Sequence, residues 1–159
     1  MGQFDYLGEP LNYIDGRTEY KYQSTTDLVA RMVYSEAAGE SYKGKQGCYW
    51  VYANRLVKNS TQFGKSTYEI LTKPGEFVGM KGSLAHKPNR TSTAWNDSCK
   101  IAVSGASNSN PVGKCLWFNT NSTFKSRSNS SGGYTFDGGK TYKKVLEKVV
   151  IGNHTFFRV

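Results

Sequence analysis

Residues 25–54 constrain what this chain can fold into more than any other stretch. Apolar side chains ahead of Glu36 recur at the three- and four-residue spacing of one helix face, and Glu36 continues that face. A carboxylate among apolar neighbours resists ionisation, which keeps its proton available near neutral pH for donation to a leaving group. The stretch therefore predicts a buried helix with a candidate proton donor, unless Glu36 reaches solvent or pairs with Arg31 or Arg55.

Capping residues set the expected bounds of this helix and of the next one. Ser24 and the two threonines after it are N-cap candidates, the helix is expected over residues 27–38, and Gly39 ends it. Glu36 then lies in the last turn, where the negative end of the helix dipole also disfavours its charge. A second helix is predicted from residue 43 or 44 to residue 58, and its nearly uniform apolar surface indicates burial on most sides.

The rest of the chain predicts short elements joined by loops. Asn54 is the polar exception on the second helix, and it either braces a loop or lines a cleft beside Glu36, because a buried amide needs partners. Residues 119–139 are rich in Ser, Asn and Gly, which predicts a long mobile loop. The other expected elements are an extended arm or short edge strand over 1–23, a loop over 59–91 with a short helix at 66–71, a helix over 93–104, a strand over 115–120 and strand-like residues on both sides of Gly152.

Length and charge narrow the class of protein. At 159 residues the chain is long enough for one domain with a core and too short for two ordinary ones. The net charge of +9 points to a polyanionic partner, which is a nucleic acid, an anionic membrane or an acidic cell-wall polymer. Nucleic acid ranks last because the basic residues are scattered and form no known motif, and no apolar run approaches the roughly 20 residues of a membrane span. The N-terminus lacks the pattern of a secretory signal, so either a signal was removed or the protein leaves the cytoplasm by another route.

Metal and nucleophile chemistry find no support in the residue spacing. Three cysteines, Cys48, Cys99 and Cys115, are an odd number without CxxC spacing, which argues against a disulfide framework but leaves one disulfide open. Because His86 and His154 also lie far apart, neither a metal site nor a cofactor is expected. No serine lies in a nucleophile elbow. A one-acid mechanism therefore stays open, because spacing places none of the carboxylates that could assist the candidate acid, which are Glu40, Glu69, Glu76, Asp97 and Asp137.

Five blocks of the chain resemble the SleB/CwlJ-type cell wall hydrolases. The first, ARMVYSEAAGESYKGKQGCYWVYANRL, is similar to the family's signature of an acidic residue followed by a helix that ends in Asn-Arg. The later blocks follow in the family's order and are KPGEFVGMKG, AWNDSCKIAVSG, CLWFNT and IGNHTFF. Several ordered blocks over about residues 27–158 are more specific than any single motif.

The resemblance implies a lysozyme-like catalytic domain that cleaves peptidoglycan between N-acetylmuramic acid and N-acetylglucosamine. In the spore-cortex members the reaction is a lytic transglycosylation, in which one glutamate acts as acid and then as base and the product carries a 1,6-anhydro ring. That glutamate matches Glu36. Glu76 stands where the family tends to have Gln and is a candidate second acid, Trp117 replaces a small residue or Tyr, and residues 120–148 have no clear counterpart.

We therefore expect one α+β domain of helices with a small antiparallel sheet, in which an arm over 1–23 precedes a catalytic domain over 24–159. Its partner is the peptidoglycan glycan strand, met outside the cytoplasm by a spore enzyme or a phage-encoded lysin. The alternatives are a hydrolytic muramidase with a second carboxylate, and a non-catalytic peptidoglycan-binding part of a phage particle that contacts virion proteins. The residues expected to line the cleft with Glu36 and bind substrate are Asn54, Phe77, Trp117, Asn119, His154 and Phe156.

Overall fold

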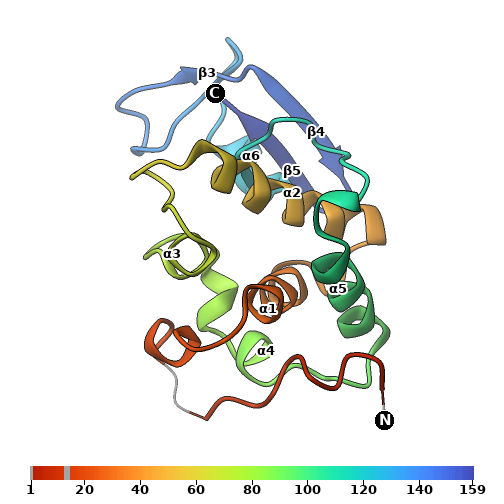
Figure 1. Cartoon of the computed structure of the whole chain (residues 1–159). Helices are drawn as coiled ribbons and strands as arrows, with labels where there is room; N and C mark the ends of the chain where they lie inside the picture. The colour runs from red at the N-terminus through yellow and green to blue at the C-terminus, as the bar shows by residue number, and fades with distance from the viewer. Residues whose placement is uncertain (1, 13–14) are drawn as a thin grey trace.

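Helices form the lower part of the molecule and a small sheet forms the upper part (Figure 1). The computed structural model describes residues 2–12 and 15–159. The predicted α+β class, with helices and a small antiparallel sheet, is confirmed. In chain order the elements are η1 (Thr18–Tyr20), α1 (Thr25–Ala37), α2 (Tyr42–Lys58), α3 (Thr67–Thr72), η2 (Val78–Lys81), α4 (Ser83–His86), α5 (Thr93–Ser104), η3 (Gly105–Ser107), β1 (Trp117–Thr120), α6 (Asn121–Ser126), β2 (Gly133–Tyr134), β3 (Lys143–Lys144), β4 (Glu147–Ile151) and β5 (His154–Arg158), where η denotes a 3-10 helix.

The α1 helix lies at the centre of the helical part and contacts α2, α3, α4 and α5. It begins where expected, because the Ser24 side chain accepts a hydrogen bond from the Asp27 amide at 3.1 Å. Most of its side chains are buried, including Arg31, whose Nε donates to the Asp27 carboxylate at 2.6 Å. A helix buried on nearly all sides holds the last turn, with Glu36, in one position.

The α2 helix connects the helical part to the sheet. Ser41 caps its first turn by accepting from the Gly44 amide at 3.1 Å. A Cβ atom at Gly47 would lie 2.7 Å from the ring of Phe156, so the sheet packs this closely on α2 only because the position is glycine.

The main sheet has the strand order β1-β5-β4, with both pairs antiparallel. Its register places Trp117 opposite Phe157, and Val149 opposite Phe156. The β2 and β3 strands form a separate antiparallel ribbon, seen at the top of Figure 1. The β1 strand lies at one edge of the main sheet, so its side chains are available to line a cleft.

The predicted mobile loop over 119–139 is wrong. It contains α6 and β2, and two of its aromatic side chains, Phe124 and Tyr134, are buried against Phe157 with ring centroids 4.9 and 4.5 Å away. Three large rings bury enough apolar area to order a segment that is otherwise polar.

The segment predicted as an extended arm packs against α1 and α5. Residues 1, 13 and 14 of that prediction lie outside the described residues; among the others no strand forms, and Leu7 is fully buried. The Gly8 amide donates to the Asp27 carboxylate at 2.8 Å. A side chain from α1, Arg31, donates to the Glu9 carbonyl at 2.6 Å. Buried contacts of this kind attach the segment to the helical part.

The three cysteines are free thiols buried in the fold. Burial raises the pKa of Cys99 and of Cys115 to about 12 and raises that of Cys48 as well. Within the described residues, no cluster of His, Cys, Asp and Glu side chains could hold a metal ion. No helix in that part of the chain is long and apolar enough to cross a membrane.

Candidate active site

Glu36 lies in the last turn of α1, and its carboxyl group lines a cavity of about 300 Å³. Its Oε1 accepts a hydrogen bond from the Gly79 amide at 3.1 Å. Burial raises the pKa of Glu36, and the Gly79 hydrogen bond opposes this rise without cancelling it. The side chain is therefore an acid that holds its proton to a higher pH than an exposed glutamate does.

The arginines that sequence spacing offers as partners for Glu36 are bound elsewhere. Arg31 pairs with Asp27, and Arg55 pairs with Glu76 at 3.3 Å between Nη1 and Oε2. In the described part of the chain, no Lys, Arg or His nitrogen lies within 4.0 Å of the Glu36 carboxylate. No nearby cation therefore stabilises its charged form.

A glycine lets the backbone reach Glu36. A Cβ atom at Gly79 would lie 3.0 Å from Ser35 Oγ and 3.1 Å from Glu36 Oε1, so a larger residue would displace the amide that binds the carboxylate. The chain arrives there through Phe77, whose φ of 43° and ψ of 52° are left-handed. The Met80 amide then donates to the Phe77 carbonyl at 2.9 Å and closes the turn. The predicted loop over 59–91 thus supplies a positioned hydrogen-bond donor beside Glu36.

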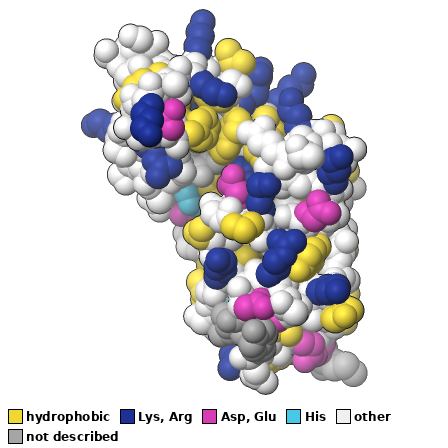
Figure 2. Space-filling view, turned by 90° about the vertical axis from the view of Figure 1, so that its left-hand side faces the viewer, with side chains coloured by type: hydrophobic (Ala, Val, Ile, Leu, Met, Phe, Trp, Pro, Cys, Tyr) yellow, Lys and Arg dark blue, Asp and Glu magenta, His cyan; other side chains and the backbone are white. Residues whose placement is uncertain are grey.

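The cavity has two sides that come from different parts of the fold. We call the first the helix side, because its residues follow or belong to helices: Glu36, Arg55 and residues 75–78. We call the second the sheet side, which consists of Trp117, Phe118, Asn119, Arg127, Tyr134, Phe136 and Phe157. On the outer surface, basic side chains are spread widely with few acidic ones between them (Figure 2).

Glu76 shares the cavity with Glu36 but is already paired. Its partner Arg55 is buried, and Arg55 Nε donates to the Leu116 carbonyl at 2.7 Å. The Arg55 guanidinium also lies over the rings of Phe63 and Phe77, 4.6 and 5.1 Å from their centroids. The candidate second acid is thus held as the counter-charge of a buried cation.

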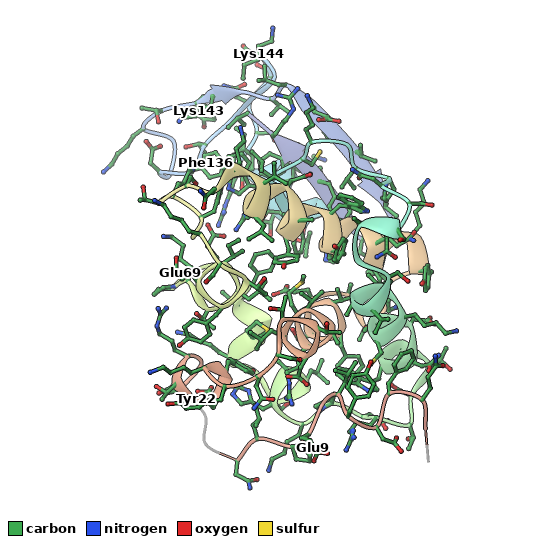
Figure 3. The ribbon with its side chains drawn as sticks, viewed as in Figure 1. Glu9, Tyr22, Glu69, Phe136, Lys143 and Lys144 are labelled. Atoms are coloured by element: carbon green, nitrogen blue, oxygen red, sulfur yellow. The ribbon has the colours of Figure 1, made fainter. Side chains whose placement is uncertain are left out.

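The sheet side presents aromatic faces and an amide. The Trp117 ring stacks on Phe157 at 5.9 Å and lies 5.0 Å from Phe136, which is 46% exposed. Asn119 Nδ2 donates to the Tyr134 hydroxyl at 2.5 Å. Figure 3 shows Phe136 below the ribbon that carries Lys143 and Lys144, which point outward from the top of the molecule. Trp117 and Asn119 lie at the cavity, as expected of substrate-binding residues.

Three other expected residues do not line this cavity. Asn54 donates from Nδ2 to the carbonyls of Gly113 and Cys115, both at 2.9 Å, so it braces a loop rather than a cleft beside Glu36. Phe156 is fully buried against α2, because the face of β5 that carries it points into the core. His154 lies behind the cavity lining, 5.2 Å from the Phe118 ring, and its Nδ1 is 4.0 Å from Glu40 Oε1. Burial lowers the pKa of His154, and Glu40 partly offsets this.

Phe77 reaches the cavity but not as the exposed ring that the sequence suggests. It is only 7% exposed, and its ring packs 6.1 Å from that of Phe118 and beneath the Arg55 guanidinium. Its neighbours already use most of the ring surface, so it shapes the cavity more than it offers a stacking face.

Sequence reasoning missed several residues of the site, among them Gly79, Arg127, Tyr134 and Phe136. Gly79 lies within one of the family-like blocks, and its closeness to an acid could have been suspected only from the glycines of KPGEFVGMKG. Arg127, Tyr134 and Phe136 lie in the segment mistaken for a mobile loop. The signal available for them was the presence of aromatic residues in a stretch otherwise made of Ser, Asn and Gly.

Comparison with known proteins agrees with this fold. Residues 39–157 match the Cell Wall Hydrolase family, a range that begins just after the helix turn that carries Glu36. The catalytic domain of the Bacillus cereus SleB protein superposes with a TM-score of 0.59 at 20% identity, over 93% of this chain and 100% of that chain. The catalytic domain of the germination-specific lytic transglycosylase SleB from Bacillus anthracis gives 0.55 at 18%, over 94% of this chain and 100% of that one. Curated proteins give no significant match.

The two structural matches show that the fold is the one adopted by SleB catalytic domains. The family match covers most of the chain and includes the residues that line the cavity, except Glu36, which lies three residues before the match begins. The resemblance found in the sequence is therefore confirmed, and the chain belongs to the Cell Wall Hydrolase family.

Proposed function

We propose that this chain cleaves the bond between N-acetylmuramic acid and N-acetylglucosamine in peptidoglycan by lytic transglycosylation, with Glu36 as the only acid and base. The family supplies the substrate class, and the structural relative from Bacillus anthracis is a lytic transglycosylase. The observation that carries the proposal is the state of Glu36: it is partly buried at a cavity, no Lys, Arg or His nitrogen of the described residues lies within 4.0 Å of its carboxylate, and burial raises its pKa.

The reaction needs one group that first gives and then takes a proton. Protonated Glu36 donates its proton to the glycosidic oxygen, and the bond from that oxygen to C1 of the muramic acid breaks. The carboxylate formed then takes the proton of the muramic acid C6 hydroxyl as the C6 oxygen bonds to C1. The product carries a 1,6-anhydro ring, and Glu36 is protonated again for the next cycle. The Gly79 amide supports the step in which Glu36 is charged, because it donates to Oε1.

Hydrolysis is the competing reaction, since Glu76 lines the same cavity and could in principle activate water. Its pairing with Arg55 favours the one-acid reaction, because a carboxylate held beside a buried guanidinium is less free to turn toward a water molecule. The released products distinguish the two reactions, since transglycosylation gives anhydro ends and hydrolysis gives reducing ends.

The sheet side of the cavity suits a sugar chain. Rings of Trp117 and Phe136 offer apolar faces of the kind on which pyranose rings stack. Asn119 donates a hydrogen bond from Nδ2 to the Tyr134 hydroxyl, so its Oδ1 remains to accept a hydrogen bond from the N–H of an acetamido group. These roles separate recognition, on the sheet side, from proton transfer, on the helix side.

Lysis of purified sacculi tests the proposal. Glu36→Gln keeps the size of the side chain but cannot donate a proton, so lysis should fall by roughly 10²- to 10⁴-fold while the fold is kept. Glu9→Gln makes the same charge change at an exposed residue at the opposite end of the molecule from the sheet (Figure 3), and it should lyse like the wild type.

Mass spectrometry of the muropeptides gives the second readout. Wild type and Glu76→Gln should both release anhydro ends. Undiminished lysis by Glu36→Gln would contradict the assignment of Glu36 as the acid. If the wild type releases reducing ends and Glu76→Gln does not, the reaction is hydrolysis and not transglycosylation. A wild type without turnover would leave a non-catalytic binding module.

A further inference from the structure

One cation at the cavity has no acidic partner. Arg127 follows α6, its side chain is exposed, and it lines the sheet side of the cavity. Within residues 2–12 and 15–159, no carboxylate lies within 4.0 Å of its guanidinium, whereas an acid does lie within that distance of Arg31, Arg55, Arg90 and Arg158. A guanidinium left open in a cavity is a site for an anion.

Two neighbours hold Arg127 in this position. Its Nη1 lies 3.4 Å from the Tyr134 hydroxyl, which also accepts from Asn119 Nδ2 at 2.5 Å. The backbone is fixed as well, because the Arg127 carbonyl accepts from the Thr135 amide at 2.9 Å. Tyr134 is 1% exposed, so the hydroxyl that orients the guanidinium is itself immobile.

The arrangement concentrates hydrogen-bond donors. An arginine carries five N–H groups, and only one of its nitrogens is engaged with Tyr134. The Tyr134 oxygen already receives two N–H donors, so its own O–H hydrogen is left to donate. A planar anion with two oxygens fits such a set, because a guanidinium binds a carboxylate through two parallel hydrogen bonds.

We propose that Arg127, oriented by Tyr134, binds the carboxylate of a muramic acid unit, carried by its lactyl group or by the peptide attached there. This inference rests on the proposed function, since it takes peptidoglycan as the substrate. In a glycan strand the N-acetylglucosamine units are neutral, and the muramic acid units carry the lactyl group. The two sugars alternate along the strand, so binding of a muramic acid carboxylate at Arg127 fixes how the strand lies in the cavity. It therefore also selects which of the two kinds of glycosidic bond lies at Glu36.

The position of Arg127 leaves the acid undisturbed. The pKa of Glu36 is set by burial and by the Gly79 amide, both on the helix side. Arg127 belongs to the sheet side, and its charge is not among the causes of the Glu36 pKa shift. Substrate anchoring and acid catalysis are therefore separable by mutation.

Binding to two matched glycans tests the proposal. Strands stripped of their peptides by an amidase carry lactyl carboxylates, and the same strands amidated with a carbodiimide and methylamine carry none. Calorimetry in the Glu36→Gln background, which does not cut the ligand, should show about tenfold tighter binding of the carboxylate form. Adding Arg127→Gln should remove this preference. Arg127→Lys should restore part of it, because lysine keeps the positive charge but lacks the planar pair of N–H donors of a guanidinium.

The control for charge is Lys125→Gln on the same α6 helix, which removes one exposed cation outside the cavity and should keep the preference. Peptide-bearing strands identify the source of the carboxylate: a preference that appears only with them assigns the peptide, and one that persists on stripped strands assigns the lactyl group. The inference is overturned if Arg127→Gln still prefers the carboxylate form of the glycan. It is also overturned if the protein with Arg127 prefers the carboxylate form over the amidated form neither for stripped strands nor for peptide-bearing ones. Turnover by the wild type separates that failure from a failure of the proposed function.

Discussion

The two sides of the cavity differ in how their charges are compensated. In the helical part, buried polar and charged groups have partners: Arg31 Nε lies 2.6 Å from the Asp27 carboxylate, and His86 Nε2 lies 2.7 Å from Glu19 Oε1. On the sheet side, Arg127 has no acidic partner among the described residues. The difference indicates two tasks, since the helical part raises the pKa of Glu36 by burial while the sheet part leaves the Arg127 guanidinium and aromatic rings open in the cavity.

The matched charges also explain how Gly79 is held. Arg31 Nη1 donates to the Ala85 carbonyl at 2.7 Å, and His86 Nδ1 lies 2.8 Å from the Gly82 carbonyl. The Arg31 contact ties α4 to α1, the His86 contact closes the start of α4, and α4 follows the η2 turn that contains Gly79. The buried Arg31 side chain thus supports the segment that carries the amide beside Glu36.

The largest effect should come from breaking a buried pair of the helical part. Arg31→Met leaves the Asp27 carboxylate buried without its cation and strands the carbonyls of Glu9 and Ala85, which should cost about 3–5 kcal/mol of stability. Chemical denaturation measures this cost.

The matched change on the sheet part is Arg158→Met. Its partner Glu147 lies at 2.9 Å, but both side chains are about one-third exposed, so the expected cost is below about 1 kcal/mol. Equal losses in the two variants would contradict the contrast between the two parts of the molecule.

A smaller effect, on binding rather than stability, should follow from removing a sheet-side ring. Phe136→Ala takes away a half-exposed face beside Trp117 and should raise KM on soluble glycan by roughly three- to tenfold, with little change in Tm. Tyr22→Ala removes an aromatic ring that is 86% exposed at the opposite end of the molecule (Figure 3), and it should change neither quantity. A Phe136→Ala protein with wild-type KM would show that this ring takes no part in recognition.

The smallest effect concerns the pH dependence of stability. Because the folded protein raises the pKa of Glu36 above its usual 4.5, the unfolded chain releases that proton first as pH rises. Glu36 thus lowers stability progressively from about its ordinary pKa up to its raised value, and the loss is complete above that value. Glu36→Gln should therefore raise Tm at neutral pH and leave it nearly unchanged at pH below about 4. A variant less stable than the wild type at neutral pH would mean that the carboxylate is stabilised there.

Periodicity and capping were sufficient to predict most of the helical part. The α1 helix was expected over 27–38 and spans Thr25–Ala37, and the helix expected over 93–104 is α5. Local signals decide such elements, since apolar spacing and N-cap side chains act within a few residues. The same spacing left open whether Glu36 reaches solvent or pairs with an arginine, and the structure places it partly buried at the cavity with neither arginine as partner.

The sheet side of the cavity could not be predicted from local sequence signals, because contacts between residues distant in sequence form it. Phe124 and Tyr134 belong to one polar segment and are buried against Phe157, which lies on the last strand, and this burial overrides the polar composition around them. Asn54 shows the same limit at one residue, since a buried amide must find acceptors but spacing does not say on which side they lie. Pairing of Glu76 with Arg55 likewise depends on a loop returning to α2.

The buried cysteines make the fold independent of redox conditions. A thiol reacts as its thiolate, and burial disfavours that form at Cys48, Cys99 and Cys115 alike. All three are single thiols packed within the fold, so oxidants and reductants alike leave its cross-linking unchanged. The same folded state is therefore available under reducing and under oxidising conditions.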